Sequence, residues 1–395
     1  MKNCLKILPV LIAVFAAGLA RGQNNQDEIV ITHPVSALGN TKPVPVSLEG
    51  FSGEVADVLK FDLYVQGFSF VASDAAQYQI SGTAAGSVHG RVVDRFAKST
   101  ILSHGYTGTS LRRQAHAFAD DIVQAITHKK GIAQTQIAFK AQSSTGNGEI
   151  YVADFDGHNA QSITHDDTIV AAPAWVPGRL AVYYTSYKRN NPDIFYHNLG
   201  TGQRRVIAGY SGLNTSAAVS PDGSKVAMIL SKSGSPDVWI CNADGSNFKR
   251  LTATPEDESS PCWSPDGRWI YFATRINERR MLAKVSPNGG EIQPVPTPGA
   301  PNPTEPDWSP DGKWIAFTSQ MGEFNVCVMP ADGSAPPTML VQGTDPSWSP
   351  NSRTLIFVRR TSSYRYMLSL LDVYTKQVKD IQQVSGNDSE PAWAK

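Results

Sequence analysis

The chain has 395 residues, of which 41% are hydrophobic and 18% are charged, and its 35 Lys and Arg residues balance its 35 Asp and Glu residues. This balance excludes a strongly basic or acidic protein, so net charge draws it to neither nucleic acid nor a membrane surface. The length suits one small domain followed by a larger one.

The first 22 residues have the pattern of a signal peptide. Lys2 and Lys6 precede an apolar run over residues 5–19, and small residues surround Ala20 and Gly22. The run is short for a permanent membrane span, so we expect export and cleavage, with no membrane insertion of the mature chain. An uncleaved anchor is the alternative.

Residues 23–43 are predicted to be a mobile amino-terminal segment. It is polar at first and rich in turn residues towards its end. Between these parts lies a strand-like patch close to the free amino terminus. Such a patch is either an edge strand of the protein's own sheet or a segment that pairs with a partner protein. The patch consists of Asp27, Glu28, Ile29, Val30, Ile31 and Thr32.

Residues 44–133 are predicted to form a small α+β domain. Apolar residues at helical spacing predict a helix over 52–65, and a second helix begins after the capping residue Ser110 and ends at 129–131. His116 lies on this second helix and is interpreted as a surface or capping residue rather than a ligand. The strand candidates are 68–72, 78–81, 88–94 and 100–102.

Residues 134–395 carry a repeat with a period of 40 to 45 residues. Five copies have Trp, and one has Val, at positions 175, 219, 263, 308, 348 and 393. In the clearest copies Ser-Pro-Asp-Gly supplies a tight turn after this position, and an apolar strand follows. Two further strands complete each period, which predicts the four-stranded blades of a β-propeller. The fold class is therefore mostly β, a six-bladed β-propeller preceded by a small α+β domain.

The first blade lacks its first strand, because residues 137–140 resemble a second strand. Residues 389–393 resemble a first strand and lie at the other end of the chain. We therefore expect the carboxyl-terminal strand to complete the first blade and close the ring.

One position of the repeat indicates binding. If the first strands are innermost and parallel, the residues three positions before each repeated Trp or Val, directly before the proline where the copy has one, gather at one rim of the channel. They are acidic on one side and small on the other, although a solvated loop with incidental acids is the alternative. A weak divalent cation at the channel mouth would relieve repulsion between the acids. In ring order these residues are Ala172, Ser216, Ser260, Glu305, Asp345 and Glu390.

No catalytic or cofactor motif is present. The chain has no G-x-S-x-G, H-E-x-x-H, C-x-x-C or phosphate-binding loop. The segment Asp154–Gly157 resembles the start of a calcium loop but lacks its later oxygen ligands, so a hairpin turn is favoured. We expect no enzyme, no cofactor and no bound structural metal. The repeated Trp residues are interpreted as packing between blades rather than as a carbohydrate site, and Cys241, Cys262 and Cys327 as buried thiols.

The segment 111–122, with 126–127 and 130–139, resembles the junction of TolB proteins, and the blades resemble their propeller repeats. The resemblance covers nearly all of the mature chain. It implies a monomeric periplasmic scaffold of the Tol-Pal system that maintains outer-membrane integrity and acts in cell division. The alternative is a propeller accessory domain of an envelope peptidase or hydrolase.

The same resemblance implies two partners. The peptidoglycan-associated lipoprotein Pal would bind the propeller rim, and the inner-membrane protein TolA would bind Asp27–Thr32. The expected Pal-binding residues are Leu213, Ser216, Ser259, Ser260, Glu305, Asp345 and Glu390.

Overall fold

The computed structural model describes residues 38–395 except 40, 143–145, 362–364, 383 and 385. The predicted signal peptide and the strand-like patch Asp27–Thr32 lie outside these described residues. The elements therefore begin with β1, at the start of the α+β domain, and end with β29 at the carboxyl terminus.

The amino-terminal part has both helices and a sheet, as predicted, but the sheet has five strands, because residues 44–49 form a strand that is not among the candidates. The strand order is β2-β1-β3-β4-β5, in which β1 is parallel to both of its neighbours and the other pairs are antiparallel. The elements are β1 (Val44–Glu49), α1 (Gly53–Tyr64), β2 (Phe68–Phe70), β3 (Tyr78–Thr83), β4 (Val88–Asp94), β5 (Ser99–Tyr106) and α2 (Leu111–Thr127).

Apolar side chains of α1 and α2 form one core with the sheet. Leu59 and Leu63 of α1 and Phe118 of α2 belong to the same core cluster, and all three are fully buried. Phe118 lies over Gly90 of β4, where a Cβ atom would fall 2.2 Å from the ring. The helical periodicity read from the sequence therefore marks the faces that pack.

The ends of several elements differ from the prediction. Helix α2 begins after Ser110, whose Oγ accepts the Arg113 N–H at 3.2 Å, but it ends at Thr127 because His128 adopts a left-handed conformation and closes the last turn. Strand β2 is shorter than expected and β5 is longer. Such end positions depend on local capping and pairing that periodicity does not record.

Six four-stranded antiparallel sheets form the propeller, and each runs outward from the channel. The first blade is β29 (Asn387–Trp393), β6 (Gln136–Gln142), β7 (Gly148–Asp154) and β8 (Gln161–Ser162). The second blade is β9 (Val170–Trp175), β10 (Ala181–Ser186), β11 (Asp193–Asn198) and β12 (Arg204–Ala208). The third blade is β13 (Asn214–Val219), β14 (Lys225–Leu230), β15 (Asp237–Asn242) and β16 (Lys249–Arg250).

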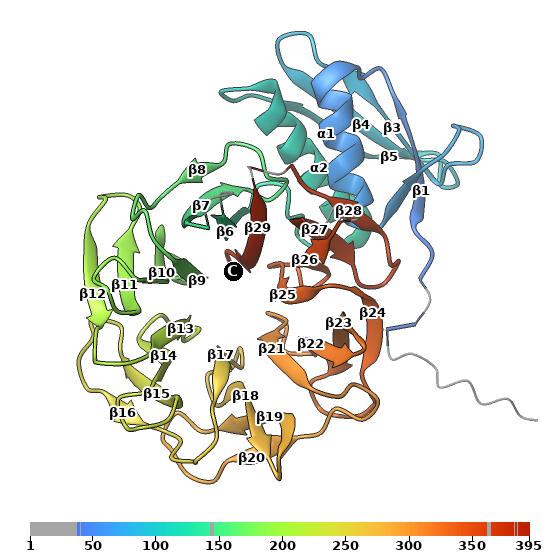
Figure 1. The fold of residues 1–395 in the computed structure, drawn as a ribbon. Coiled ribbons are helices and arrows are strands. Elements are labelled where there is room, and N and C mark those ends of the chain that lie inside the picture. The colour runs from blue at the N-terminus through green and yellow to red at the C-terminus, as the bar shows by residue number, and fades with distance from the viewer. Residues whose placement is uncertain (1–37, 40, 143–145, 362–364, 383, 385) are drawn as a thin grey trace, which may run out of the picture. The chain divides into compact units, whose positions relative to one another are not determined.

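The remaining blades follow in chain order around the ring (Figure 1). The fourth blade is β17 (Ser259–Trp263), β18 (Ile270–Ile276), β19 (Arg279–Val285) and β20 (Gln293–Val295). The fifth blade is β21 (Pro303–Trp308), β22 (Trp314–Met321), β23 (Glu323–Pro330) and β24 (Thr338–Gln342). The sixth is β25 (Thr344–Trp348), β26 (Thr354–Arg360), β27 (Tyr366–Asp372) and β28 (Val378–Asp380).

The carboxyl-terminal strand closes the ring, as predicted. Strand β29 pairs antiparallel with β6, and Trp393 lies opposite Ile137. The first blade is therefore built from the two ends of the propeller sequence. Closure gives each inner strand a neighbouring blade on both sides and leaves no open side in the ring.

The repeated Trp side chains pack between blades, which confirms the packing interpretation. The indole N–H of Trp175 donates to the Ala392 carbonyl of the preceding blade at 3.1 Å, and that of Trp263 donates to the Ala218 carbonyl at 3.0 Å. Trp348 is completely buried. Cys241, Cys262 and Cys327 are buried free thiols, also as predicted.

Candidate functional site

The inner strands surround a channel along the propeller axis. Strands β9, β13, β17, β21, β25 and β29 gather around the centre in Figure 1, and the cavity they enclose has a volume of about 1020 Å³. Its wall includes the repeated prolines and the rings of Trp175, Trp263, Trp308 and Trp393. The cavity is thus largely apolar, with a few polar groups at fixed positions, which is the usual composition of a binding site.

The six predicted rim positions line this channel, but they do not lie at strand starts. Each lies inside an inner strand and has a left-handed φ of 50–55°. At each one the register shifts, so two residues face one on the next strand; Glu305 and Pro306, for example, together face Phe317. This is a β-bulge, which occurs where proline has no N–H to give to the ladder. In β13 Ala217 takes the proline position, and the bulge persists.

Two of the acids at these positions accept hydrogen bonds from the next blade. Glu390 Oε2 accepts the Ala172 N–H at 2.5 Å, and Glu305 Oε2 accepts the Asp345 N–H at 3.0 Å. Glu305 also accepts from Thr318 Oγ1 at 2.6 Å. These carboxylates therefore stabilise the bulges of neighbouring blades, a role that the linear sequence does not reveal.

Glu305, Asp345 and Glu390 form a group that we call the channel acids. The positive charge near them is Lys140, whose Nζ lies 3.5 Å from Glu390 Oε1. Burial raises the pKa of Asp345 well above its usual range, and the charges of Glu305 and Glu390 raise it further. The raised pKa favours the neutral form of Asp345, and it shows that Glu305 and Glu390 give this half of the channel a negative potential that Lys140 offsets only in part. Lys395, which also lines the channel, pairs with Asp307.

The opposite half of the channel has small side chains. Ala172, Ser216 and Ser260 occupy the bulge positions there, and Trp175 and Trp263 of the same strands are among the residues that line the cavity. The other two residues expected at the rim, Leu213 and Ser259, are not among those that line the channel. Leu213 packs between blades, and Ser259 pairs in the sheet beside a second pocket of about 170 Å³.

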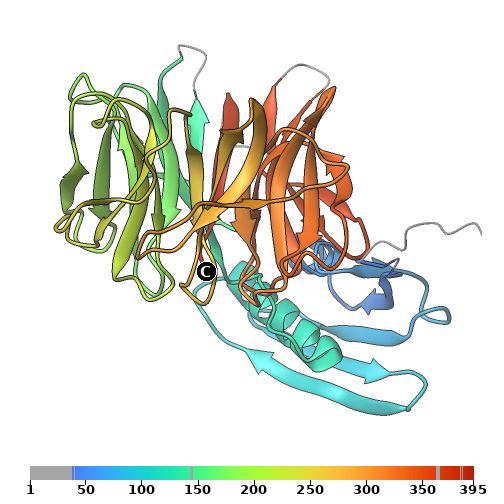
Figure 2. The same cartoon turned by 90° about the horizontal axis from the view of Figure 1, so that it is seen from below.

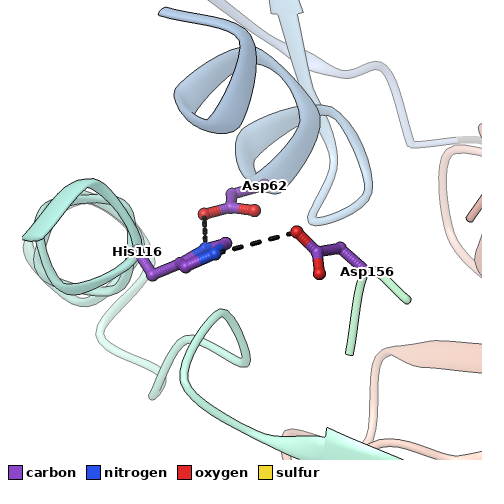
Figure 3. A group of neighbouring side chains, drawn as sticks. All are labelled: Asp62, His116 and Asp156. Atoms are coloured by element: carbon purple, nitrogen blue, oxygen red, sulfur yellow. Dashed lines mark hydrogen bonds and ion pairs between the residues drawn. The ribbon is translucent and has the colours of Figure 1, made fainter. Parts of the chain in front are cut away.

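A second polar group, the junction cluster, lies where the α+β domain meets the propeller. It consists of Asp62 of α1, His116 of α2 and Asp156 of the turn between β7 and β8 (Figure 3). His116 Nδ1 lies 2.7 Å from Asp62 Oδ2, and His116 Nε2 lies 3.7 Å from Asp156 Oδ2. All three side chains are buried.

The interpretation of His116 as a surface or capping residue is therefore wrong. Helix α2 packs against both α1 and the first blade, and contact with a distant segment buries the side chain. One signal was available in the sequence, because Arg112, His116 and Asp120 recur every four residues and thus form a polar stripe on an otherwise apolar face. The Asp154–Gly157 segment does form a turn, and its Asp156 points into the junction.

The junction cluster contains its own counter-charges. Burial raises the pKa of Asp62 to about 7, while the hydrogen bond to His116 opposes this rise. Burial disfavours the charged form of His116, but the hydrogen bond and charge of Asp62 outweigh it, so its pKa is also raised. Arg112 Nη2 contacts Asp156 and lies 2.7 Å from His158 Nδ1. A positive charge thus already lies beside the oxygen that a metal ion would use.

Further contacts join the α+β domain to the sixth blade. Thr354 Oγ1 donates to the Val65 carbonyl at 3.1 Å, and Gln377 Nε2 donates to the Phe68 carbonyl at 2.9 Å. Figure 2 shows the helices of the α+β domain along one face of the propeller. The junction cluster and these bonds together position the two domains.

Within the described part of the chain, neither helix has the length and apolar content needed to cross a membrane. The fold and the channel define a β-propeller protein with an amino-terminal α+β domain and an axial cavity. A sequence profile described as "TolB beta propeller domain" matches residues 123–395. The chain belongs to this TolB family.

Individual relatives agree with this assignment. The chain is 28% identical over 286 residues to the Tol-Pal system protein TolB of Bordetella pertussis, an alignment that covers 72% of this chain and 64% of the relative. It is 33% identical over 156 residues to the protein of that name from Anaeromyxobacter dehalogenans, which covers 40% of this chain and 36% of the relative. The crystal structure of TolB from Acinetobacter baumannii superposes with a TM-score of 0.80 at 20% identity, covering 90% of this chain and 97% of that one.

Proposed function

We propose that the protein is a non-catalytic, monomeric binding protein of the periplasm that acts in the Tol-Pal system. It binds the lipoprotein Pal at the propeller channel and TolA through Asp27–Thr32, and in this way supports outer-membrane integrity and cell division. The observation that carries the proposal is the divided channel, in which Ala172, Ser216 and Ser260 face an excess of carboxyl groups around a partly apolar cavity.

The divided channel suits a partner with two features. An apolar segment would lie against the Trp rings beside Ser216 and Ser260, where small side chains leave room. A basic side chain of the partner, or a divalent cation, would lie beside Asp345 and offset the excess charge there. Leu213 and Ser259 lie outside the channel wall, so we expect them to influence the partner only indirectly.

The first test is binding of purified Pal, measured by calorimetry. Ser216→Trp should abolish it, because the large ring would fill the neutral half of the channel. Thr201→Trp, on the exposed turn between β11 and β12, is the matched control and should bind as the wild type does. Replacing all three channel acids by the corresponding amides should weaken binding and flatten its salt dependence. Wild-type affinity in both channel variants would exclude the channel as the site.

The second test separates the two partners. Deletion of residues 24–32 should abolish TolA binding and leave Pal binding intact, because the proposed segments are distinct. Loss of both activities, or of neither, would contradict the assignment. Recovery of a peptidase or hydrolase instead of Pal from envelope extract would favour the alternative function as an accessory domain.

A further inference from the structure

Three aromatic rings surround the ammonium group of Lys232. This residue lies in the loop between β14 and β15 of the third blade. Its Nζ is 3.7 Å from the ring centroid of Tyr210, 4.1 Å from that of Trp239 and 5.0 Å from that of Phe248. We call Tyr210, Trp239 and Phe248 the aromatic cage.

The rings are held in place from behind and remain accessible in front. Tyr210 follows β12, Trp239 is on β15 and Phe248 precedes β16, so tertiary folding brings them together. Their backs pack against the buried cluster between the second and third blades. The planes of the Tyr210 and Phe248 rings are at 89° to each other with centroids 5.4 Å apart, so the two rings form perpendicular sides of the cage. All three rings, and Lys232 itself, are only partly buried.

The cage suits a different cation better than it suits lysine. A primary ammonium group carries three N–H donors, and in the described part of the chain no hydrogen bond or ion pair engages Lys232. A quaternary ammonium group has no donors to satisfy, and it gains the same attraction to the faces of the rings. A cage of three rings without a carboxylate is therefore matched to a fully alkylated ammonium ion.

The Lys232 side chain is also able to move out of the aromatic cage. Its loop, Ser231–Pro236, is short and contains Gly234 with φ of +112°, and the lysine side chain can extend into solvent without moving a strand. We propose that the aromatic cage is a binding site for a quaternary ammonium group, and that Lys232 occupies it as a built-in competitor. The ligand group could belong to a free solute of the choline type or to a choline lipid headgroup.

The direct test compares choline binding by the wild type and by Lys232→Ser. Binding is followed through the Trp239 indole N–H signal in NMR spectra, which is assigned with Trp239→Phe. If the cage is open about one-tenth of the time in the wild type, the variant should bind about tenfold more tightly, because an occupied site lowers apparent affinity by the open fraction. Adding Tyr210→Ala to the variant should remove the binding.

Matched controls decide the outcome. Lys284 lies over only two rings, 4.5 Å from the Trp269 centroid and 5.9 Å from that of Tyr271, so Lys284→Ser should create no choline site. If Tyr210→Ala fails to fold, Phe248→Leu serves in its place. The proposal is wrong if folded Lys232→Ser shows no binding up to about 50 mM choline, or if binding survives loss of a cage ring.

Vesicles distinguish the two sources of the ligand. Co-sedimentation of Lys232→Ser with phosphatidylcholine vesicles, but not with phosphatidylglycerol vesicles, would identify a lipid headgroup. Choline binding without co-sedimentation would identify a free solute. Sedimentation with both lipids that persists after loss of a cage ring would contradict the role of the cage.

Discussion

The junction cluster and the channel acids are both groups of buried or partly buried carboxyl groups, but their charges are compensated differently. At the junction, Asp62 and Asp156 are accompanied by His116 and Arg112 at contact distance. In the channel, three acids share Lys140 and otherwise rely on hydrogen bonds from backbone N–H groups and threonines.

This difference indicates different roles. Each buried carboxylate of the junction has a cationic partner within the fold, although Asp62 Oδ1 and His116 Nε2 lack hydrogen-bond partners among the described residues, and removing one member leaves an uncompensated charge. A group of carboxyls with too few cations is less stable by itself and gains from an incoming positive group. We therefore infer that the junction cluster holds the domains together, whereas the channel acids are available to a ligand.

The largest expected effect comes from deleting residues 387–395, because β29 belongs to both regions. It carries Glu390 into the channel, and its Trp393 stacks on Phe155 beside the junction. The deletion opens the ring and exposes the edge of β6, so the melting temperature should fall by at least about 10 °C. Calorimetry measures this, and deletion of residues 23–26 is the control. Equal effects of the two deletions would exclude closure by β29.

The next effect tests the junction alone. His116→Leu leaves Asp62 and Asp156 without the imidazole between them, so the free energy of unfolding should fall by about 3–5 kcal/mol. Urea denaturation measures the change. His104→Leu removes a histidine from an exposed pair with Asp121 and should change stability by less than about 1 kcal/mol. A similar small change in both variants would mean that the cluster does not secure the junction.

The pH dependence of stability tests the same cluster. The pKa values of Asp62 and His116 are both raised on folding, so folding favours their protonated forms. Their contribution is therefore greatest at low pH and is lost as pH rises through about 7. The double variant Asp62→Asn, His116→Gln lacks these titrations. The stability of the wild type relative to this variant should fall by roughly 2 kcal/mol between about pH 5.5 and 8.5. A difference that is constant with pH would contradict this assignment.

The smallest expected effect is a gain in stability rather than a loss, and it tests the channel acids. Asp345→Asn should stabilise the protein by up to about 1 kcal/mol at neutral pH, because it removes one of three neighbouring carboxyl groups. The pKa of Asp345 is raised, so the wild type loses stability as pH rises through that value, and the gain of the variant should appear over the same range. Thermal unfolding at several pH values measures it. Destabilisation at every pH would show that the channel acids are as well compensated as the junction.

Much of the fold follows from local patterns. The spacing of the Trp positions predicts six blades, and the truncated repeat at residues 389–393 predicts closure, because each blade repeats one turn and one apolar strand. The apolar face of α2 is predicted by the same reasoning. The positions that line the channel are also identified, although their bulges are not, because a bulge depends on pairing with the next strand.

Only the tertiary structure decides the charge compensation. Asp62, His116 and Asp156 are 40 or more residues apart, and so are Glu305 and Asp345, whose backbone N–H donates to the Glu305 carboxylate. The aromatic cage is likewise assembled from three separate segments around Lys232. A sequence by itself determines which face of an element is buried and where the chain turns, because neighbouring residues set those preferences. Which charged and aromatic groups meet across elements depends on how the blades and helices pack. The packing therefore decides that the junction cluster stabilises the domain contact, whereas the channel acids are available to a ligand.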